Sequence, residues 1–258
     1  MAEVEANGLR FHVQRLGAGP RTVVFLHGLV MDNLSSWYFS VANSAAQKAD
    51  VVLYDLRGHG RSERPSSGYG LDEMVADLEG ILDAQGIDGP VDLIGNSYGG
   101  LLALAFAFAH PERTDGLLLA DPHLITEGWG DLMKSTLHAQ GDEAIDLIAK
   151  NFATWKGRHS ERKRNKLLLT ARDLIYGTSL VADLEAAAPF SDEALAAISC
   201  PVLCLFGEHS DIREQCEPRF RRVPMCEVRI FPGCTHSILW EATAELKDLV
   251  VNWVGRPV

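Results

Sequence analysis

Short apolar runs alternate with amphipathic stretches along most of the chain. Continuous apolar runs bounded by turn residues are typical of strands that are buried on both faces. They predict strands at 9–15, 22–27, 50–55, 91–95, 115–120, 201–206 and 226–231. Apolar residues at helical spacing predict helices at 37–48, 71–85, 97–109, 192–198 and 240–254. This alternation predicts an α/β fold with a doubly wound, mostly parallel sheet.

The alternation stops between residues 122 and 190. That stretch carries helical patterns without a convincing strand, for example at 142–152 and 162–176. We therefore predict an all-helical insertion after the sixth strand of the sheet, with the sheet domain formed by residues 1–121 and 191–258.

The pentapeptide Gly-Asn-Ser-Tyr-Gly at 95–99 joins an apolar strand pattern to an apolar helix pattern. A strand must turn sharply into a helix at Ser97, and Gly95 and Gly99 let the backbones approach without Cβ clashes. This geometry exposes the serine hydroxyl at the end of the sheet, above the positive end of a helix. The context predicts that Ser97 is a nucleophile.

A serine hydroxyl is a poor nucleophile at neutral pH, so it needs an imidazole base, which in turn needs a carboxylate. His236 lies in the loop after the 226–231 strand, and Asp211 lies in the loop after the 201–206 strand. We predict that His236 is the base and that Asp211 orients it. Asp121, which directly follows the 115–120 strand, is the alternative acid.

These motifs resemble those of the α/β-hydrolase superfamily. Similar motifs are Val-Val-Phe-Leu-His-Gly-Leu at 23–29, Asp-Leu-Arg-Gly-His-Gly-Arg-Ser at 55–62, the Ser-Asp-His order, and the His-x4-Glu ending at 236–241. One departure is that Asp211 lies four residues after Gly207, where many members have three.

The resemblance implies an α/β-hydrolase fold in which residues 122–190 form a helical cap over the active site. It implies that the backbone N–H of Leu29 forms the oxyanion hole with that of Tyr98, which begins the helix after Ser97. The expected pocket residues are Val30, Trp129, Trp155 and Trp240. For the two cap residues, Trp129 and Trp155, holding the cap to the sheet domain is an equally open role.

A serine in this position argues against the relatives that open epoxides or displace halide, because those use aspartate. The predicted reaction is hydrolysis of a carboxylic ester or thioester through an acyl-enzyme on Ser97. Asn96 and the Trp240–Glu241 pair resemble the C–C hydrolases that cleave diketones, although Ser237 replaces the tryptophan beside their histidine. A small-molecule receptor that retains the triad is a third alternative.

The composition of the chain limits which binding partners, cofactors and locations we expect. A net charge of −11 argues against nucleic acid, and 47% hydrophobic with 23% charged residues is ordinary for a globular protein. No zinc-type His/Cys spacing or phosphate-binding glycine loop is present, so we expect no metal and no cofactor. Residues 1–10 have no apolar core, and the five cysteines form no Cys-x-x-Cys. We therefore expect a cytoplasmic protein that does not engage a membrane.

Basic residues gather in the insertion of this acidic chain. They are Lys150, Lys156, Arg158, Arg162, Lys163, Arg164 and Lys166. Two interpretations stay open: a solvated helix face, or a docking patch for an anionic substrate or an acidic acyl carrier protein.

Overall fold

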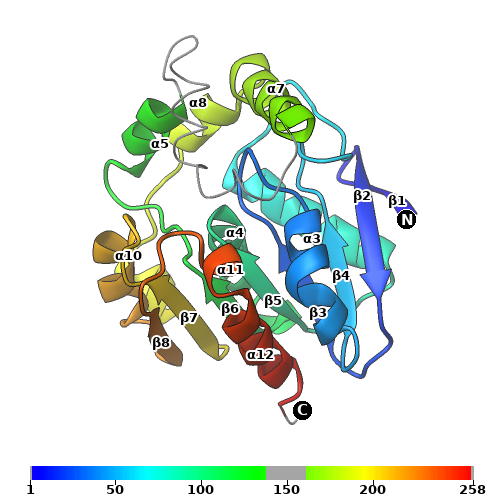
Figure 1. Cartoon of the computed structure of the whole chain (residues 1–258), viewed down its shortest axis with the longest axis vertical. Coiled ribbons are helices and arrows are strands. Elements are labelled where there is room, and N and C mark those ends of the chain that lie inside the picture. Colours follow the sequence, from blue (N-terminus) through cyan, green and yellow to red (C-terminus); the bar gives the residue numbers. More distant parts are fainter. Residues whose placement is uncertain (1, 138–160, 257–258) are drawn as a thin grey trace.

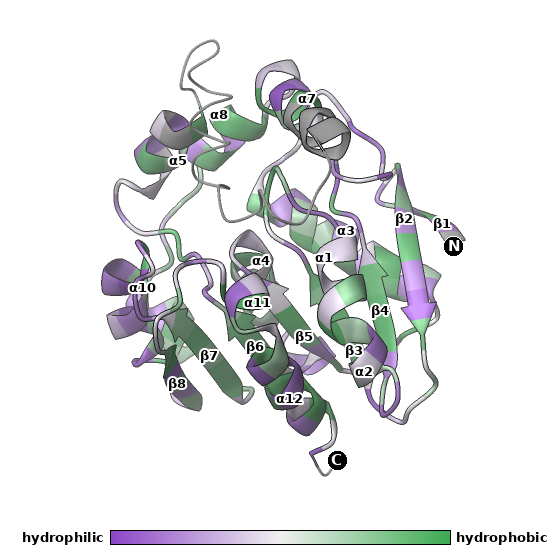
Figure 2. Ribbon diagram, in the orientation of Figure 1, coloured by the Kyte–Doolittle hydropathy of each residue, from purple (hydrophilic) through white to green (hydrophobic). Residues whose placement is uncertain are grey.

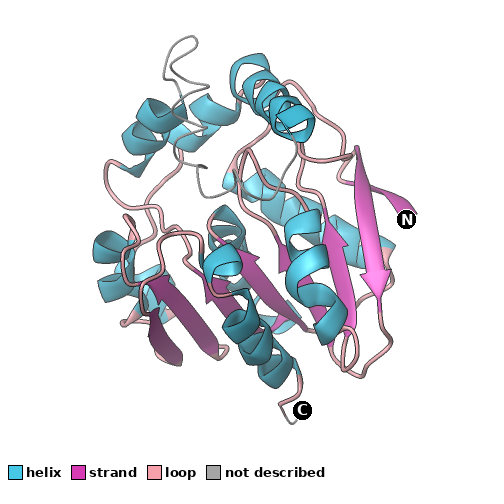
Figure 3. Cartoon of the chain, in the orientation of Figure 1, coloured by secondary structure: helices cyan, strands magenta, loops and turns pink. Residues whose placement is uncertain are grey.

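The computed structural model describes residues 2–137 and 161–256. It contains an eight-stranded sheet in the order β1-β2-β4-β3-β5-β6-β7-β8 (Figure 1, Figure 3). The strands are β1 Ala2–Ala6, β2 Leu9–Leu16, β3 Thr22–Leu26, β4 Asp50–Tyr54, β5 Val91–Asn96, β6 Thr114–Ala120, β7 Val202–Gly207 and β8 Cys226–Phe231. β2 is antiparallel to both β1 and β4, whereas every pairing from β4 to β8 is parallel. The predicted mostly parallel sheet is confirmed.

Both faces of the central sheet are buried, and this is why its strands are continuously apolar. In β3, Val24 and Leu26 belong to one hydrophobic core and Val23 and Phe25 to the other. Figure 2 shows the central strands as mainly hydrophobic. The first core includes residues of α3 Leu71–Ala84, α4 Tyr98–Ala109 and α10 Arg213–Phe220. The second includes residues of α1 Ser35–Trp37, η1 Tyr38–Ala42, α2 Asn43–Ala45, α11 Ile238–Glu241 and α12 Thr243–Val254.

Helices occupy the described part of the predicted insertion between β6 and β7. They are α5 Trp129–Leu137, α7 Glu161–Gly177 and α8 Leu180–Glu185, followed by α9 Asp192–Ala196. Figure 1 shows α5, α7 and α8 beyond the edge toward which the parallel strands run. The backbone N–H of Phe190 donates to the carbonyl of Ile125 (3.1 Å), so the segment leaves and rejoins the sheet domain at neighbouring points. The boundary of a separate cap at 122–190 stays a prediction.

The pattern analysis missed β1 and α10. β1 is a short edge strand of alternating pattern, in which the buried Val4 and Ala6 alternate with the exposed Glu3 and Glu5. α10 is strongly hydrophilic, contains Pro218, and buries just Cys216 and Phe220, so its amphipathic signal is weak. A 3-10 turn, η2 Pro111–Arg113, precedes β6. Within residues 2–137 and 161–256, no helix is both long and apolar enough to cross a membrane.

Candidate active site

Ser97 lies at a strained turn between β5 and α4. Its backbone has φ of 54° and ψ of −120°, an unfavourable conformation for a residue with a side chain. The turn is tight because a Cβ on Gly95 would lie 2.3 Å from the carbonyl oxygen of Gly99, and one on Gly99 would lie 2.2 Å from that of Leu26. The Ser97 N–H donates to the carbonyl of Ala120 (3.0 Å), which ties the turn to β6. The flanking glycines therefore allow the geometry that the sequence predicted.

His236 connects Ser97 to a carboxylate. Its Nε2 lies 2.9 Å from Ser97 Oγ, and its Nδ1 lies 2.5 Å from Asp121 Oδ2. Since a carboxylate accepts hydrogen bonds, the Nδ1 proton faces Asp121 and Nε2 is left to accept the Ser97 proton. The three side chains come from the ends of β5, β6 and β8, which meet at one edge of the sheet.

Hydrogen-bond donors on both carboxylate oxygens fix the orientation of the Asp121 side chain. It directly follows β6 with φ of 50° and is 1% exposed. Its Oδ1 accepts the N–H of Gly207 (2.8 Å), and its Oδ2 accepts the hydroxyl of Ser210 (2.5 Å) as well as His236. A buried carboxylate whose oxygens accept these hydrogen bonds has little freedom to rotate and positions the imidazole firmly.

The prediction that Asp211 orients His236 is wrong, and the alternative, Asp121, makes this contact. The turn after β7 points Ser210 inward, where it is 8% exposed, and leaves the next residue, Asp211, exposed. Ser210 is the residue three positions after Gly207, where many members of the family have the acid. In this chain that position supplies a hydroxyl donor to the acid of the neighbouring strand.

Burial and nearby negative charges have opposite effects on the pKa of His236. Partial burial lowers the pKa of His236, whereas the hydrogen bond and charge of Asp121, then the charges of Asp211 and Glu241, raise it. The net effect raises the pKa above its ordinary value of 6.5. Asp211 thus acts on His236 at a distance, through charge, without a described hydrogen bond to it.

The loop after β3 presents the N–H of Leu29. The N–H of Gly28 donates to Asp32 Oδ2 (2.8 Å), and that of Val30 donates to His59 Nε2 (2.8 Å). For the N–H groups of Leu29 and Tyr98, the described residues provide no acceptor. Val30 has φ of 65°, so the loop bends back at this point. Two available N–H groups beside Ser97 fit the predicted oxyanion hole.

His27 and His59 hold this loop in place. His27 Nε2 accepts the N–H of Leu56 (2.9 Å), and its Nδ1 lies 2.6 Å from the carbonyl of Gly28. Burial, followed by the nearby His27, lowers the pKa of His59 to about 3, so His59 stays neutral and can accept the Val30 N–H. Both histidines therefore form hydrogen bonds with the backbone of the loops after β3 and β4.

His123 is a neighbour of the site that the sequence did not indicate. Its ring centroid lies 5.4 Å from that of His236, and its Nδ1 accepts the indole N–H of Trp129 (3.2 Å). Burial, and then the charge of His236, lowers its pKa to about 3. His123 therefore stays neutral when His236 takes a proton.

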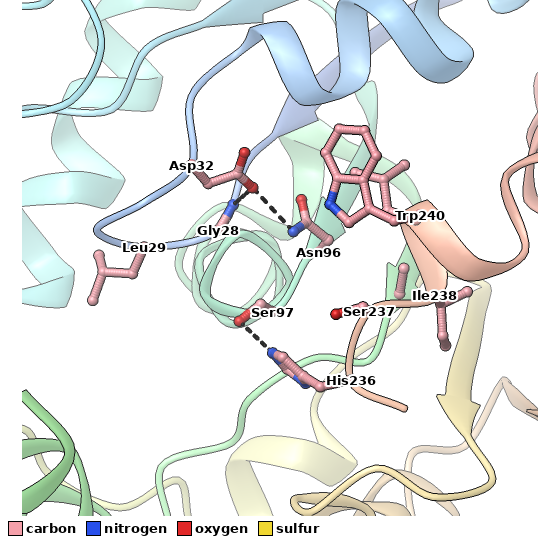
Figure 4. Close-up of a pocket in the computed structure, with 11 residues that line it drawn as sticks. Gly28, Leu29, Asp32, Asn96, Ser97, His236, Ser237, Ile238 and Trp240 are labelled. Carbon is pink, nitrogen blue, oxygen red and sulfur yellow. Dashed lines mark hydrogen bonds between the residues drawn. The ribbon is translucent and has the colours of Figure 1, made fainter. Parts of the chain in front are cut away.

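A cavity of about 100 Å³ opens beside Ser97 (Figure 4). It is lined by Gly28, Leu29, Asp32, Asn96, Ser97, Ala120 and residues 236–240. Of the expected pocket residues, Trp240 lines this cavity, whereas Val30 is buried and does not. Trp129 is buried against His123. Within the described residues, no group of three or more His, Cys, Asp or Glu side chains is placed to hold a metal ion.

Part of the sequence-based interpretation lies outside the described structure. Trp155, Lys150, Lys156 and Arg158 fall in 138–160. The side chains of Arg162, Lys163, Arg164 and Lys166, at the start of α7, are likewise not described. The acyl-carrier docking patch stays a prediction.

Comparisons with known proteins show which family this chain is similar to. Residues 21–198 match the model of a family described as alpha/beta hydrolase fold. The chain is 39% identical over 119 residues to a 2-hydroxy-6-oxo-2,4-heptadienoate hydrolase of Pseudomonas putida (45% of this chain, 42% of the relative). It is 37% identical over 118 residues to the lipase LipV of Mycobacterium tuberculosis (45% and 43%). These matches span less than half of the curated relatives' length.

The fold is shared with solved structures. An esterase from Exiguobacterium antarcticum superposes with a TM-score of 0.82 at 19% identity, covering 98% of this chain and 99% of that one. At this identity the likeness concerns the fold.

Proposed function

Because this chain belongs to the α/β-hydrolase family, we propose that it is an enzyme that hydrolyses a carboxylic ester or thioester through an acyl-enzyme on Ser97. The single observation that carries the proposal is the continuous hydrogen-bonded path from Ser97 Oγ through His236 to Asp121. Such a path raises the nucleophilicity of a hydroxyl that is otherwise inert at neutral pH.

The mechanism follows from the positions of these groups. Ser97 Oγ attacks the carbonyl carbon while its proton moves to His236 Nε2, and Asp121 stabilises the resulting imidazolium. The N–H groups of Leu29 and Tyr98 receive the negative carbonyl oxygen. Collapse breaks the bond to the leaving oxygen or sulfur, which takes the proton from His236. Water then repeats the sequence on the acyl-enzyme, the carboxylic acid leaves, and Ser97 recovers its proton.

Substitution of the serine and the histidine tests the proposal. Ser97→Ala and His236→Ala should each lower kcat/KM for phenyl esters by about 10⁴-fold while circular dichroism stays unchanged. A fluorophosphonate should add its mass to Ser97 in the wild type. Full activity in either variant, or labelling of another residue, contradicts the proposal, and a folded wild type without turnover favours the receptor alternative.

C–C bond hydrolysis is the second candidate, and the similarity to the heptadienoate hydrolase favours it. Of the residues that motivated this alternative, Asn96 and Trp240 line the cavity beside Ser97, whereas Glu241 does not. Against it, Asp32 puts a negative charge at the same cavity, where a dienoate carboxylate would be repelled. Comparing kcat/KM for a vinylogous diketone acid with that for phenyl esters decides between the two reactions.

Docking of an acidic acyl carrier protein is a separate proposal, and the basic residues of the insertion in an acidic chain are what support it. If the basic residues of the insertion steer an acidic carrier, replacing Arg162, Lys163 and Arg164 with alanine should lower kcat/KM for a carrier-bound thioester at low salt. Small neutral esters should be unaffected, because their encounter needs no steering. If the wild type and the triple variant have equal kcat/KM for the carrier-bound thioester, the carrier does not dock at these residues.

A further inference from the structure

The cavity beside Ser97 is small and polar at one end. Asp32 and Asn96 form that end with Trp240 beside Asn96, and Ser97, Ser237 and His236 lie on the other side (Figure 4). Its volume of about 100 Å³ is small beside the roughly 300 Å³ or more of a pocket that holds a drug-sized ligand. A group of a few atoms fits, and it would be attached close to the reacting carbonyl.

Asp32 fixes the orientation of the Asn96 amide. Asp32 Oδ2 accepts the Asn96 Nδ2–H (3.2 Å) and the N–H of Gly28 (2.8 Å). Its Oδ1 accepts the N–H of Asn33 (2.9 Å) and the hydroxyl of Ser36. A carboxylate has no proton to donate, so a flipped amide would bring two acceptor oxygens together. In Figure 4 a dashed line joins the Asn96 nitrogen to Asp32, and the Asn96 oxygen is drawn beside Trp240.

Gly28 is what allows this close assembly. A Cβ at position 28 would lie 3.1 Å from Asn96 Nδ2 and 3.2 Å from Asp32 Oδ2, closer than ordinary van der Waals contact. The loop after β3 therefore packs directly against the amide, which holds it in one position.

The Asn96 oxygen is left as a buried acceptor. Its Oδ1 has no hydrogen-bond partner in the described structure. A buried acceptor without a partner destabilises a protein by more than an ordinary hydrogen bond stabilises it. Binding of a group that donates a hydrogen bond to this oxygen is therefore favourable. The four described partners of Asp32 are all neutral, and none of the residues that line the cavity is lysine or arginine. The potential in the cavity thus also favours a donor over an anion.

We propose that this cavity binds a short acyl group that carries a hydrogen-bond donor, a hydroxyl or an amide N–H, next to the scissile carbonyl. This inference rests on the proposed function. The acyl group stays attached to Ser97 through both half-reactions, so a fixed acceptor at this point assists both. Asn96 Oδ1 accepts the donor, and the Asp32 charge excludes acyl groups that end in a carboxylate.

Three phenyl esters with the same leaving group test the acyl preference. Glycolate carries the donor, propionate matches its size without the donor, and methoxyacetate matches its electron withdrawal without the donor. Each kcat/KM is divided by the rate constant for hydroxide-catalysed hydrolysis of the same ester. The wild type should favour glycolate over both others by about tenfold or more, because a site built for a hydroxyl rejects analogues that lack it.

Asn96→Leu should remove this preference, because leucine keeps the volume and lacks the acceptor. Asn33→Leu is the matched control: the same substitution in the same loop, outside the cavity, should keep the preference. A wild type that ranks the three esters as hydroxide does overturns the inference without any variant. So does an Asn96→Leu enzyme that keeps the glycolate preference.

Failure of the two proposals can be told apart. If the esters are hydrolysed and a fluorophosphonate labels Ser97, but glycolate is not favoured, the acyl preference alone is overturned. If no ester is hydrolysed and Ser97 is not labelled, the proposed function fails and takes this inference with it.

Discussion

The turns after β6 and β7 lie beside each other at the edge of the sheet, and each carries an aspartate. Asp121 comes directly after β6, and its N–H donates to the carbonyl of Leu205 in β7 (2.7 Å), so its side chain starts inside the sheet edge. Asp211 comes four residues after the end of β7 and is exposed. Both carboxylates raise the pKa of His236, but Asp121 alone makes a described hydrogen bond to it.

This difference shows that the two turns contribute in different ways to the position of the base, His236. The β6 turn supplies the acid, and the β7 turn supplies the two donors, the Gly207 N–H and the Ser210 hydroxyl, that orient the acid. Because parallel neighbouring strands end side by side, a carboxylate from either strand end can approach the histidine. Which one does so depends on the direction of individual side chains in the turns.

Asp121→Asn should have the largest effect on this arrangement, lowering kcat/KM by about 10⁴-fold. The Gly207 N–H holds the amide oxygen at the Oδ1 position, so the amide nitrogen faces His236 and donates to Nδ1. The imidazole proton then moves to Nε2, which can no longer accept the Ser97 proton. The measurement is kcat/KM for a phenyl ester, and retained activity would contradict the assignment.

The same variant should change the pH dependence. The wild-type base must be neutral, so kcat/KM falls as the pH drops through the His236 pKa, which is raised above 6.5. Without the Asp121 carboxylate the largest raising influences are gone and burial lowers the pKa. The acidic limb of the residual activity should therefore move to lower pH, and a shift to higher pH would mean that Asp121 is not what raises the His236 pKa.

Moving the acid to the neighbouring strand end should partly restore the enzyme. In Asp121→Asn combined with Ser210→Asp, the new carboxylate starts from a position whose oxygen lies 2.5 Å from the present Asp121 Oδ2. We expect kcat/KM at least about tenfold above that of Asp121→Asn alone, because a carboxylate near Nδ1 restores the useful tautomer. Asp121→Asn combined with Asp211→Glu is the control and should show no recovery.

Ser210→Ala should have a smaller effect. Loss of one charge-assisted hydrogen bond to Asp121 loosens the acid and should lower kcat by about tenfold, with KM nearly unchanged. Asp121 Oδ2 would then interact with His236 alone, so the acidic limb should move to higher pH. Ser210→Thr, which keeps the hydroxyl, should restore both the rate and the limb. If the acidic limb of the pH profile does not move in Ser210→Ala, the Ser210 hydroxyl does not influence the His236 pKa.

Asp211→Asn should have the smallest effect. Its carboxylate is exposed, so its influence on His236 is screened by solvent, and kcat/KM should stay within about twofold. The acidic limb should move slightly to lower pH, because the Asp211 charge raises the His236 pKa. Raising the salt concentration in the wild type should reproduce this small shift.

The sequence predicted the elements whose signals are local. Gly95 and Gly99 around Ser97 sit between a strand pattern and a helix pattern, and the backbone contacts show why glycine is needed there. The acid could not be predicted in the same way, because both aspartates follow apolar strands. The direct attachment of Asp121 to the end of β6, and a serine three residues after Gly207, were the available signals.

Other features depend on contacts between residues distant in the chain. Asn96 and Asp32 are 64 residues apart, so no periodicity links them, although their hydrogen bond defines the polar end of the cavity. His123 likewise becomes part of the site through its contact with His236. Local patterns predict strands and turns, whereas such pairs are determined by how the strands are ordered in the sheet.

The most direct test of the central claim, that Asp121 holds His236 Nδ1, needs no substrate. A proton in a short hydrogen bond to a carboxylate is strongly deshielded, so the Nδ1 proton of His236 should give a far-downfield ¹H NMR resonance. We predict that this resonance is present in the wild type and in Asp211→Asn, and absent in Asp121→Asn. Its persistence in Asp121→Asn together with its loss in Asp211→Asn would contradict the account.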